Sequence, residues 1–121
     1  MKNLKKKPSG GRLHQAVKKH KREMGRYSIE TTKGERAVKR QRVRGGNIKS
    51  KLYHDQFVNV TDGATTKRVK IQDVIENPSN KDLNRRKVIT RNTLIKTELG
   101  KVRVTSRPGQ VPVINGVLVK E

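Results

Sequence analysis

Few side chains of this sequence have the types and the spacing that catalysis requires. The histidines are His14, His20 and His54, and the first two lie in a segment rich in lysine, where positive charge disfavours a general base. The aspartates and glutamates stand singly along the chain, without the close pair that would hold a divalent metal ion for nuclease chemistry. The residue inventory therefore argues against an enzyme and against a metal site.

The segment Gly45-Gly46-Asn47-Ile48-Lys49-Ser50 comes nearest to a nucleotide-binding motif. A phosphate-binding loop requires the pattern G-x-x-x-x-G-K-[ST], and here Ile48 occupies the position of the second glycine. We therefore expect no nucleotide cofactor at this site. Two roles remain open for the glycine pair: a tight turn, or a close approach of backbone N–H groups to a phosphate.

Charge is the strongest signal in the sequence. The chain has 121 residues with 31 Lys and Arg against 10 Asp and Glu, which gives a formal net charge of +21. A small protein with this charge repels itself unless a dense polyanion neutralises it, and nucleic acid is the first candidate. The chain has no Cys, which fits a cytoplasmic protein, and no apolar stretch approaching the ~20 residues of a membrane span. We therefore expect a nucleic-acid partner and no membrane.

Basic residues concentrate in the N-terminal half of the chain. Residues 1–51 hold 18 basic and 3 acidic side chains, against 13 and 7 in residues 52–121. We predict a basic, nucleic-acid-facing N-terminal extension over residues 1–34, followed by a folded domain over residues 35–121. Within the extension, the spacing of apolar residues from Arg12 to Met24 predicts a short basic helix with Gly25 as its C-cap.

Short strands separated by glycine and asparagine turns are predicted for the remainder. A basic strand is expected from Arg36 to Arg44, a strand pair on either side of Thr61-Asp62-Gly63, and further strands around 94–95, 102–104 and 111–119. Asn77-Pro78-Ser79-Asn80 interrupts this series, and Ser79 or Asn80 can cap a single helical turn. Five or six strands with no long helix predict a mainly β fold, a small closed-sheet or barrel-like domain.

The aromatic content indicates how nucleic acid would be bound. Only Tyr27, Tyr53 and Phe57 are aromatic, which is too few for a sheet face that stacks several bases. We therefore expect contacts to the phosphate backbone and recognition by shape, made by the basic extension, by the glycine turn and by arginines where strands meet turns. The residues predicted to bind on these grounds are Lys5, Lys6, Lys7, Arg12, Lys18, Lys19, Lys21, Arg22, Arg36, Lys39, Arg40, Arg42, Arg44, Gly45, Gly46, Lys49, Arg85, Arg86 and Arg107.

Five short motifs resemble a known family. In chain order they are Glu23-Met24-Gly25-Arg26, Glu30-Thr31-Thr32, Arg42-Val43-Arg44-Gly45-Gly46-Asn47, Val74-Ile75-Glu76-Asn77-Pro78 and Val104-Thr105-Ser106-Arg107-Pro108-Gly109-Gln110. On these motifs the chain is similar, over roughly Lys7 to Val119, to the archaeal and eukaryotic ribosomal proteins of the small subunit conventionally numbered eight, the "e" type. It looks like an archaeal member, because the long mid-chain insertion of eukaryotic members is missing.

This resemblance implies a β-barrel-like body with a basic N-terminal extension that binds ribosomal RNA in the small subunit, beside neighbouring ribosomal proteins. It implies no enzyme activity, no cofactor and no small-molecule substrate. In that family, RNA contacts are expected in the basic helix and in the Arg-Gly-Gly-Asn turn. On this sequence they correspond to Lys18, Lys19, Lys21, Arg22, Arg26, Arg42, Arg44, Gly45, Gly46 and Asn47.

Two other kinds of partner also fit the charge. A chromatin-type architectural protein that binds duplex DNA would carry such a charge on a small fold, although this chain lacks apolar wedges on an exposed ribbon and a dimer seam. A binder of membrane surfaces or anionic polysaccharides would hold liposomes or heparin in a way that RNA does not compete away. Whatever the partner, we expect the isolated domain from about Arg36 onward to stay folded without the extension.

Overall fold

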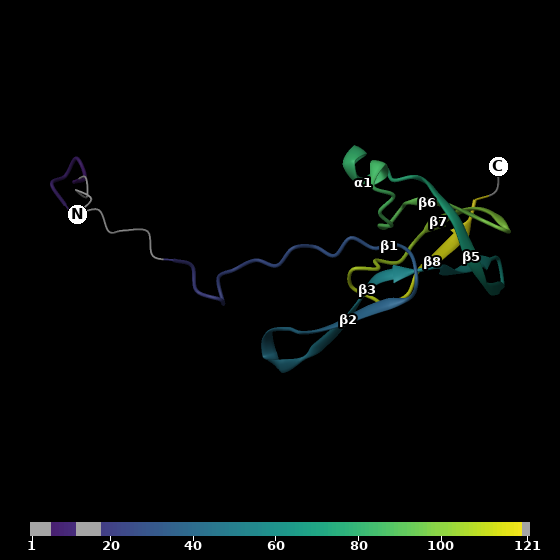
Figure 1. Ribbon diagram of the computed structural model, residues 1–121, viewed down its shortest axis with the longest axis horizontal. Coiled ribbons are helices and arrows are strands. Elements are labelled where there is room, and N and C mark those ends of the chain that lie inside the picture. Colours follow the sequence, from purple (N-terminus) through teal and green to yellow (C-terminus); the bar gives the residue numbers. More distant parts are fainter. Residues whose placement is uncertain (1–5, 12–17, 120–121) are drawn as a thin grey trace.

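The computed structural model describes residues 6–11 and 18–119 (Figure 1). Residues 18–30, called the arm below, form an extended segment that leads to the body of the protein. A two-stranded hairpin projects from that body toward the same side as the arm (Figure 1). The molecule therefore has three parts that concern function: a compact body, a hairpin and an arm.

The body is a closed barrel of five strands in the order β4-β5-β6-β7-β8. Its strands are β4 Phe57–Asp62, β5 Thr65–Glu76, β6 Leu94–Thr97, β7 Gly100–Val104 and β8 Asn115–Leu118. Neighbouring strands pair antiparallel except β4 and β8, whose parallel pairing closes the barrel. The prediction of a mainly β, barrel-like domain is confirmed.

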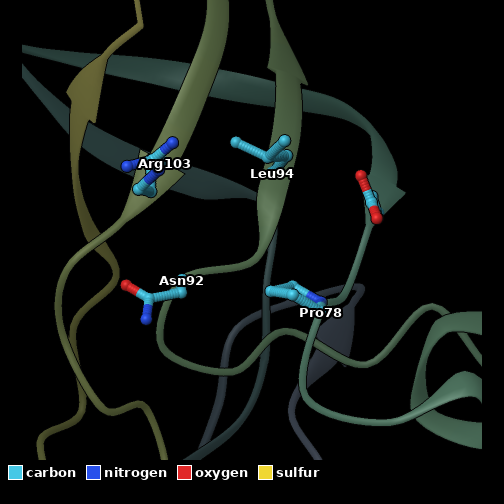
Figure 2. Close-up of a pocket in the computed structure, with 5 residues that line it drawn as sticks. Pro78, Asn92, Leu94 and Arg103 are labelled. Atoms are coloured by element: carbon cyan, nitrogen blue, oxygen red, sulfur yellow. The ribbon is translucent and has the colours of Figure 1, made fainter.

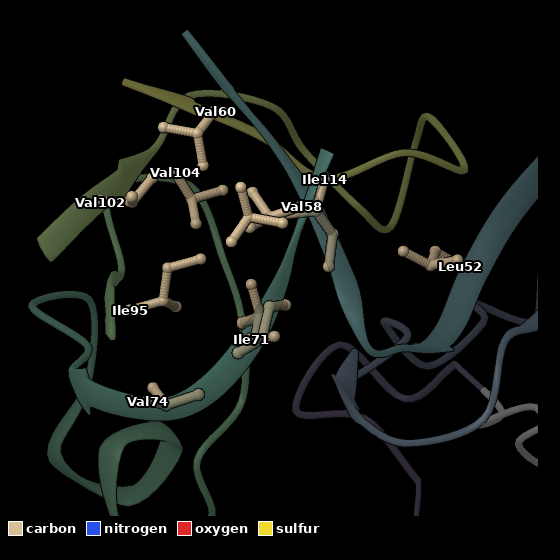
Figure 3. Packing of buried hydrophobic residues seen from close by; sticks show 11 residues of the cluster. Leu52, Val58, Val60, Ile71, Val74, Ile95, Val102, Val104 and Ile114 are labelled. Carbon is tan, nitrogen blue, oxygen red and sulfur yellow. The ribbon is translucent and has the colours of Figure 1, made fainter. Parts of the chain in front are cut away.

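Alternation of side chains along the strands builds the core of the barrel. Val58 and Val60 on β4, and Val102 and Val104 on β7, point inward and are almost fully buried. Figure 3 shows these side chains meeting one another inside the barrel. The other buried members of this core are Leu52, Val69, Ile71, Val74, Ile89, Ile95 and Ile114. Each such side chain contributes about 1.5–3 kcal/mol when it is withdrawn from water, so the body carries its own source of stability.

The hairpin forms a second, separate sheet. It consists of β2 Ala37–Arg42 and β3 Ile48–Asp55, and β1 Thr32–Lys33 pairs in parallel with β3 on the other side. The predicted strand from Arg36 to Arg44 and the turn after it are therefore confirmed. No strand was predicted over residues 48–55, because polar residues separate Ile48 from Leu52 and no regular apolar alternation is present.

The turn of the hairpin depends on its two glycines. Residues Arg44–Gly46 form a single 3-10 turn, and the φ angles of Gly45 and Gly46 are 82° and 83°. This left-handed region is costly for any residue with a Cβ atom. The turn role of the pair is thus confirmed, while the close approach of a phosphate stays a prediction.

The predicted basic helix over Arg12–Met24 is wrong where the structure describes it. Residues 12–17 lie outside the described residues, and residues 18–24 contain a turn at 21–23 instead of a helix. That turn is closed by a hydrogen bond from Glu23 N to His20 O at 2.9 Å. Four closely spaced cations repel one another on a helix surface, and local repulsion outweighs the weak apolar pattern here. Gly25 accordingly caps no helix.

Two further elements differ in extent from their predictions. The last strand, expected over residues 111–119, is confined to β8 Asn115–Leu118, because Pro112 has no N–H to donate to a sheet. The predicted helical turn is confirmed as α1 Lys81–Arg85, with Asn80 as its N-cap. At five residues, α1 is the only α-helix in the described part of the chain, and none there is long and apolar enough to cross a membrane.

The turn between the end of β5 and the start of α1 is held by the side chain of Asn77. Its side-chain nitrogen donates to the carbonyl of Val88 at 2.8 Å, and its side-chain oxygen accepts from the backbone N–H of Ser79 at 3.0 Å. Asn77 is 4% exposed, so these bonds form in a site that water does not reach freely. One of the family-like motifs therefore serves to turn the chain from β5 into α1.

The end of the arm is joined to the body. The hydroxyl of Thr31 donates to Leu52 O at 2.8 Å, and the N–H of Ile89 donates to Thr31 O at 2.7 Å. Thr31 is 1% exposed, and the β1 strand that follows it pairs with β3. Residues 31–33, which the sequence assigned to the extension, therefore contact the folded part of the chain directly.

We predict that Gly116→Ala destabilises the barrel by about 1–3 kcal/mol, the usual cost of overpacking. A Cβ at this position would lie 2.4 Å from Val102 Cγ1 and 2.9 Å from the backbone oxygen of Arg103, so β7 and β8 would have to move apart. Denaturant unfolding measures the change. Gly25→Ala is the matched control, since its Cβ would meet no atom within 4 Å; equal stabilities of the two variants would contradict the prediction.

Candidate nucleic-acid interface

The arm lies against the tip of the hairpin. Arg26 Nη1 donates to the backbone oxygen of Arg42 at 3.1 Å, and Arg44 Nη2 donates to the backbone oxygen of Arg22 at 3.4 Å. Arg22, Arg26 and Arg44, together with Lys21, Met24 and Val43, line a cavity of about 430 Å³. Four cationic side chains thus surround one hollow, where together they can neutralise the charge of phosphate groups.

Both faces of the hairpin are positively charged. Since side chains alternate along a strand and directly paired residues share a face, Lys39, Gln41, Lys49 and Lys51 lie on one face. Arg40 and Arg42 lie on the opposite face. The hairpin therefore presents lysines to one side and arginines to the other, and a polyanion can contact it from either.

Lys51 is a candidate binding residue that the sequence prediction missed. It pairs directly with Lys39 across the two strands, so two like charges face each other. The i, i+2 spacing of Lys49 and Lys51 is visible in the sequence. It places the two lysines on one face only if residues 48–55 form a strand, which the structure shows.

We predict that Lys51→Glu stabilises the hairpin of the protein without bound nucleic acid by about 0.2–1 kcal/mol, because the change converts a repulsive cross-strand pair into an attractive one. The measurement is amide hydrogen exchange of β2 and β3. Lys49→Glu is the control, because it alters the charge equally but faces Gln41. Similar protection in both variants would show that the cross-strand pair is not the cause. Both variants are expected to bind nucleic acid more weakly.

Three of the predicted arginines are engaged within the chain instead. Arg36 Nη1 lies 3.0 Å from Asp55, whose carboxylate is 2% exposed, and Arg36 Nη2 donates to Pro112 O at 3.2 Å. Arg85 is 2.8 Å from Asp82. Arg86 forms ion pairs with Glu30 and with Asp82.

Ion pairs near α1 shift the pKa values of two side chains. Burial lowers the pKa of Arg86, but its hydrogen bond to Glu30 and the charge of Asp82 raise it by more, so the net shift is upward. The ammonium of Lys87, 2.7 Å from Asp73, holds the pKa of that carboxyl below its usual value, helped by a hydrogen bond from the backbone of Val74. The carboxylates near α1 thus neutralise cations there, away from the hairpin.

The remaining predicted residues fall into three groups. Lys5 and Arg12 lie outside the described residues, and Lys6 and Lys7 are exposed. Arg107 is exposed in the loop between β7 and β8. The structure brings Lys21, Arg22, Arg26 and Arg44 together around one hollow, and Arg26 and Lys39 around a second. Lys18 and Lys19 are exposed on the arm, and the predicted residues of the hairpin are Lys39, Arg40, Arg42, Arg44, Gly45, Gly46, Asn47 and Lys49.

One cavity on the barrel lacks the paired groups that catalysis requires. A cavity of about 290 Å³ lies beside the ends of β5, β6 and β7, and Figure 2 shows Pro78, Asn92, Leu94 and Arg103 at its walls. Glu76 is its one carboxylate, with no second acid or histidine beside it. Over residues 6–11 and 18–119, no three His, Asp or Glu side chains gather where they would hold a metal ion.

Comparison of the sequence with models of known protein families identifies the family of this chain. A family model described as Ribosomal protein S8e matches residues 1–119. The chain belongs to this family. Membership confirms the resemblance carried by the five motifs, and no comparison supports a duplex-DNA-binding protein.

Close members of the ribosomal protein S8e family are archaeal, as the sequence predicts. The small ribosomal subunit protein eS8 of Nanoarchaeum equitans is 50% identical over 113 residues, which is 91% of this chain and 89% of that protein. The protein of the same name from Methanococcus aeolicus is 46% identical over 118 residues, 95% and 92% of the two chains. That from Methanococcus vannielii is 46% identical over 121 residues, 97% and 94% of the two chains.

Proposed function

We propose that this protein is a structural constituent of the small ribosomal subunit that binds and stabilises ribosomal RNA. The observation that carries the proposal is membership of the ribosomal protein S8e family over nearly the whole chain. A structural ribosomal protein performs no reaction, so neither an enzyme activity nor a cofactor is part of the proposal. It works in the cytoplasm, within the ribosome.

Binding is proposed to occur through the arm and the hairpin. Their guanidinium and ammonium groups contact phosphate oxygens, and the barrel holds the hairpin at a fixed position. Leu52 is central to this support, because its N–H donates to Pro108 O at 3.0 Å and its carbonyl accepts from Thr31. The family-like motif that contains Pro108 thereby anchors the hairpin to the body.

The proposed contacts carry little base sequence information. The lysines and arginines on both hairpin faces suit contacts to phosphates, which carry no sequence information directly. The extended arm is proposed to order fully when RNA neutralises its charge, so that folding of the arm and binding are coupled. The protein then recognises folded RNA by the positions of its phosphates in space.

Among the predicted site residues, those on the arm and hairpin are the proposed contacts. Arg36, Arg85 and Arg86 are proposed to have a structural role, since their guanidinium groups already bind carboxylates of the chain. Other ribosomal proteins are proposed as neighbours on surfaces that RNA leaves open.

Sedimentation of a cell extract through a sucrose gradient tests the proposed function. We expect the protein, detected by immunoblot, to migrate with the small subunit and the whole ribosome, and to remain there at moderate salt. Recovery only in the light fractions, or with chromatin, would contradict a ribosomal role. A parallel gradient after ribonuclease treatment serves as the control, in which the protein is expected to leave the subunit position.

A further inference from the structure

A groove between the arm and one face of the hairpin contains both tyrosines of the protein. It has a volume of about 390 Å³, within the ~300–1,000 Å³ of typical small-ligand sites. The arm contributes Gly25, Arg26, Tyr27 and Ile29, and the hairpin contributes Lys39, Gln41 and Tyr53. Aromatic, cationic and amide side chains thus meet in one hollow.

Tyr27 has no role in the packing of the fold. Its side chain is 99% exposed, more than any other large apolar or aromatic residue described. Phe57, by contrast, is covered by the guanidinium of Arg68, 4.5 Å from its ring centroid. An aromatic ring that contributes nothing to the core, yet lines a groove, is available for a ligand with a flat face.

The opposite wall of the groove holds the second ring. The register of β2 and β3 shifts between Ala37 and Val38, which leaves Tyr53 as the extra residue of a bulge. Bulges redirect a side chain away from the regular sheet pattern. Tyr53 is half-buried, and Lys39 Nζ lies 5.7 Å from its ring centroid and 3.5 Å from its hydroxyl.

Polar groups of the groove match the rest of a nucleotide. Arg26 keeps most of its guanidinium donors after bonding to Arg42 O, and Lys39 supplies an ammonium. The amide of Gln41 makes no side-chain hydrogen bond within residues 6–11 and 18–119, so its donors and acceptor are free for the edge of a base.

We propose that this groove holds one unpaired nucleotide of RNA, with its base stacked on Tyr27 and its phosphate bound by Arg26 and Lys39. The inference rests on the proposed function, since RNA bound to the arm and hairpin supplies the nucleotide. It changes the expected mode of binding at one point: two tyrosines are too few for a platform of bases, but they suffice for a single base that is extruded from a helix.

The test compares two RNA hairpins that differ in one group. The first carries a single bulged uridine, and the second carries an abasic residue at the same place, so that both present the same phosphates. The full-length protein is titrated with each RNA at one salt concentration. We expect the wild type to bind the uridine hairpin about 5-fold or more tightly than the abasic one, the lower end of what one stacked base contributes.

Two variants test whether the ring of Tyr27 causes the preference for the uridine hairpin. Tyr27→Leu is expected to remove the preference for the uridine hairpin while leaving the affinity for the abasic one unchanged, because an exposed side chain can be replaced without harming the fold. Tyr27→Phe keeps the ring and is expected to keep the preference.

Three results would overturn the inference. Equal binding of the two RNAs by the wild type would leave phosphate binding, and so the proposed function, intact. Weaker binding of both RNAs by Tyr27→Leu would show that Tyr27 positions the arm instead of stacking a base. Failure of the wild type to bind either RNA would contradict the proposed function as well.

Discussion

Replacing Arg40, Arg42, Lys49 and Lys51 by glutamine is expected to weaken binding to small-subunit ribosomal RNA on the order of 100-fold or more at 0.1 M salt. Each phosphate that a cation neutralises lowers the slope of log K against log salt by about 0.7–0.9, which is about 5- to 8-fold in affinity at that salt. The fold-changes in affinity from the four contacts multiply. All four side chains are on the hairpin, and none takes part in the hydrophobic core.

The matched control removes the same charge from the barrel. Lys67, Lys70, Lys96 and Arg103 are exposed on β5, β6 and β7, and their replacement by glutamine also lowers the net charge by four. We expect the control variant to lose only a small part of the affinity and of the salt dependence. Binding isotherms at several salt concentrations measure both quantities. Equal losses in the two variants would mean that the protein binds through its overall charge, without a defined interface.

A chain that begins at Arg36 is expected to lose several kcal/mol of folding stability. The deletion removes Thr31, and so leaves Leu52 O and Ile89 N without their partners at positions that are 0% and 1% exposed. An unsatisfied buried group costs about 1–3 kcal/mol, so the sum is about 2–6 kcal/mol of a total that is typically 5–15 kcal/mol. The loss of β1 from the edge of β3 adds to it.

A chain that begins at Ile29 is the control for this truncation. It lacks arm residues 18–28 but keeps Thr31 and β1, and we expect its free energy of unfolding in denaturant to equal that of the full-length protein. We therefore propose that the folded unit begins near Thr31, a few residues before the boundary that charge and glycine content suggested. If the shorter chain is as stable as the longer one, the contacts of Thr31 contribute nothing and the boundary at 35 is adequate.

Local patterns in the sequence were sufficient for the barrel. Alternating valines in 57–62 and 102–104, a Thr61-Asp62-Gly63 turn and an Asn80 cap each specify their element through neighbours a few residues away. The same local rules failed over residues 18–24, where weak apolar periodicity suggested a helix that charge repulsion does not permit. They did not predict β3, where Lys49, Ser50 and Lys51 separate the apolar residues Ile48 and Leu52.

The sequence by itself determined that the protein is a small β barrel with an excess of 21 positive charges, because composition and short-range alternation are properties of the chain before it folds. Only the tertiary structure decided which cations are free. Arg36 is held by Asp55, 19 residues away, and Arg86 by Glu30, 56 residues away, whereas the cations of the arm and hairpin converge around open hollows. Pairing over such separations depends on how the strands are arranged in space, and no local pattern of residues encodes it.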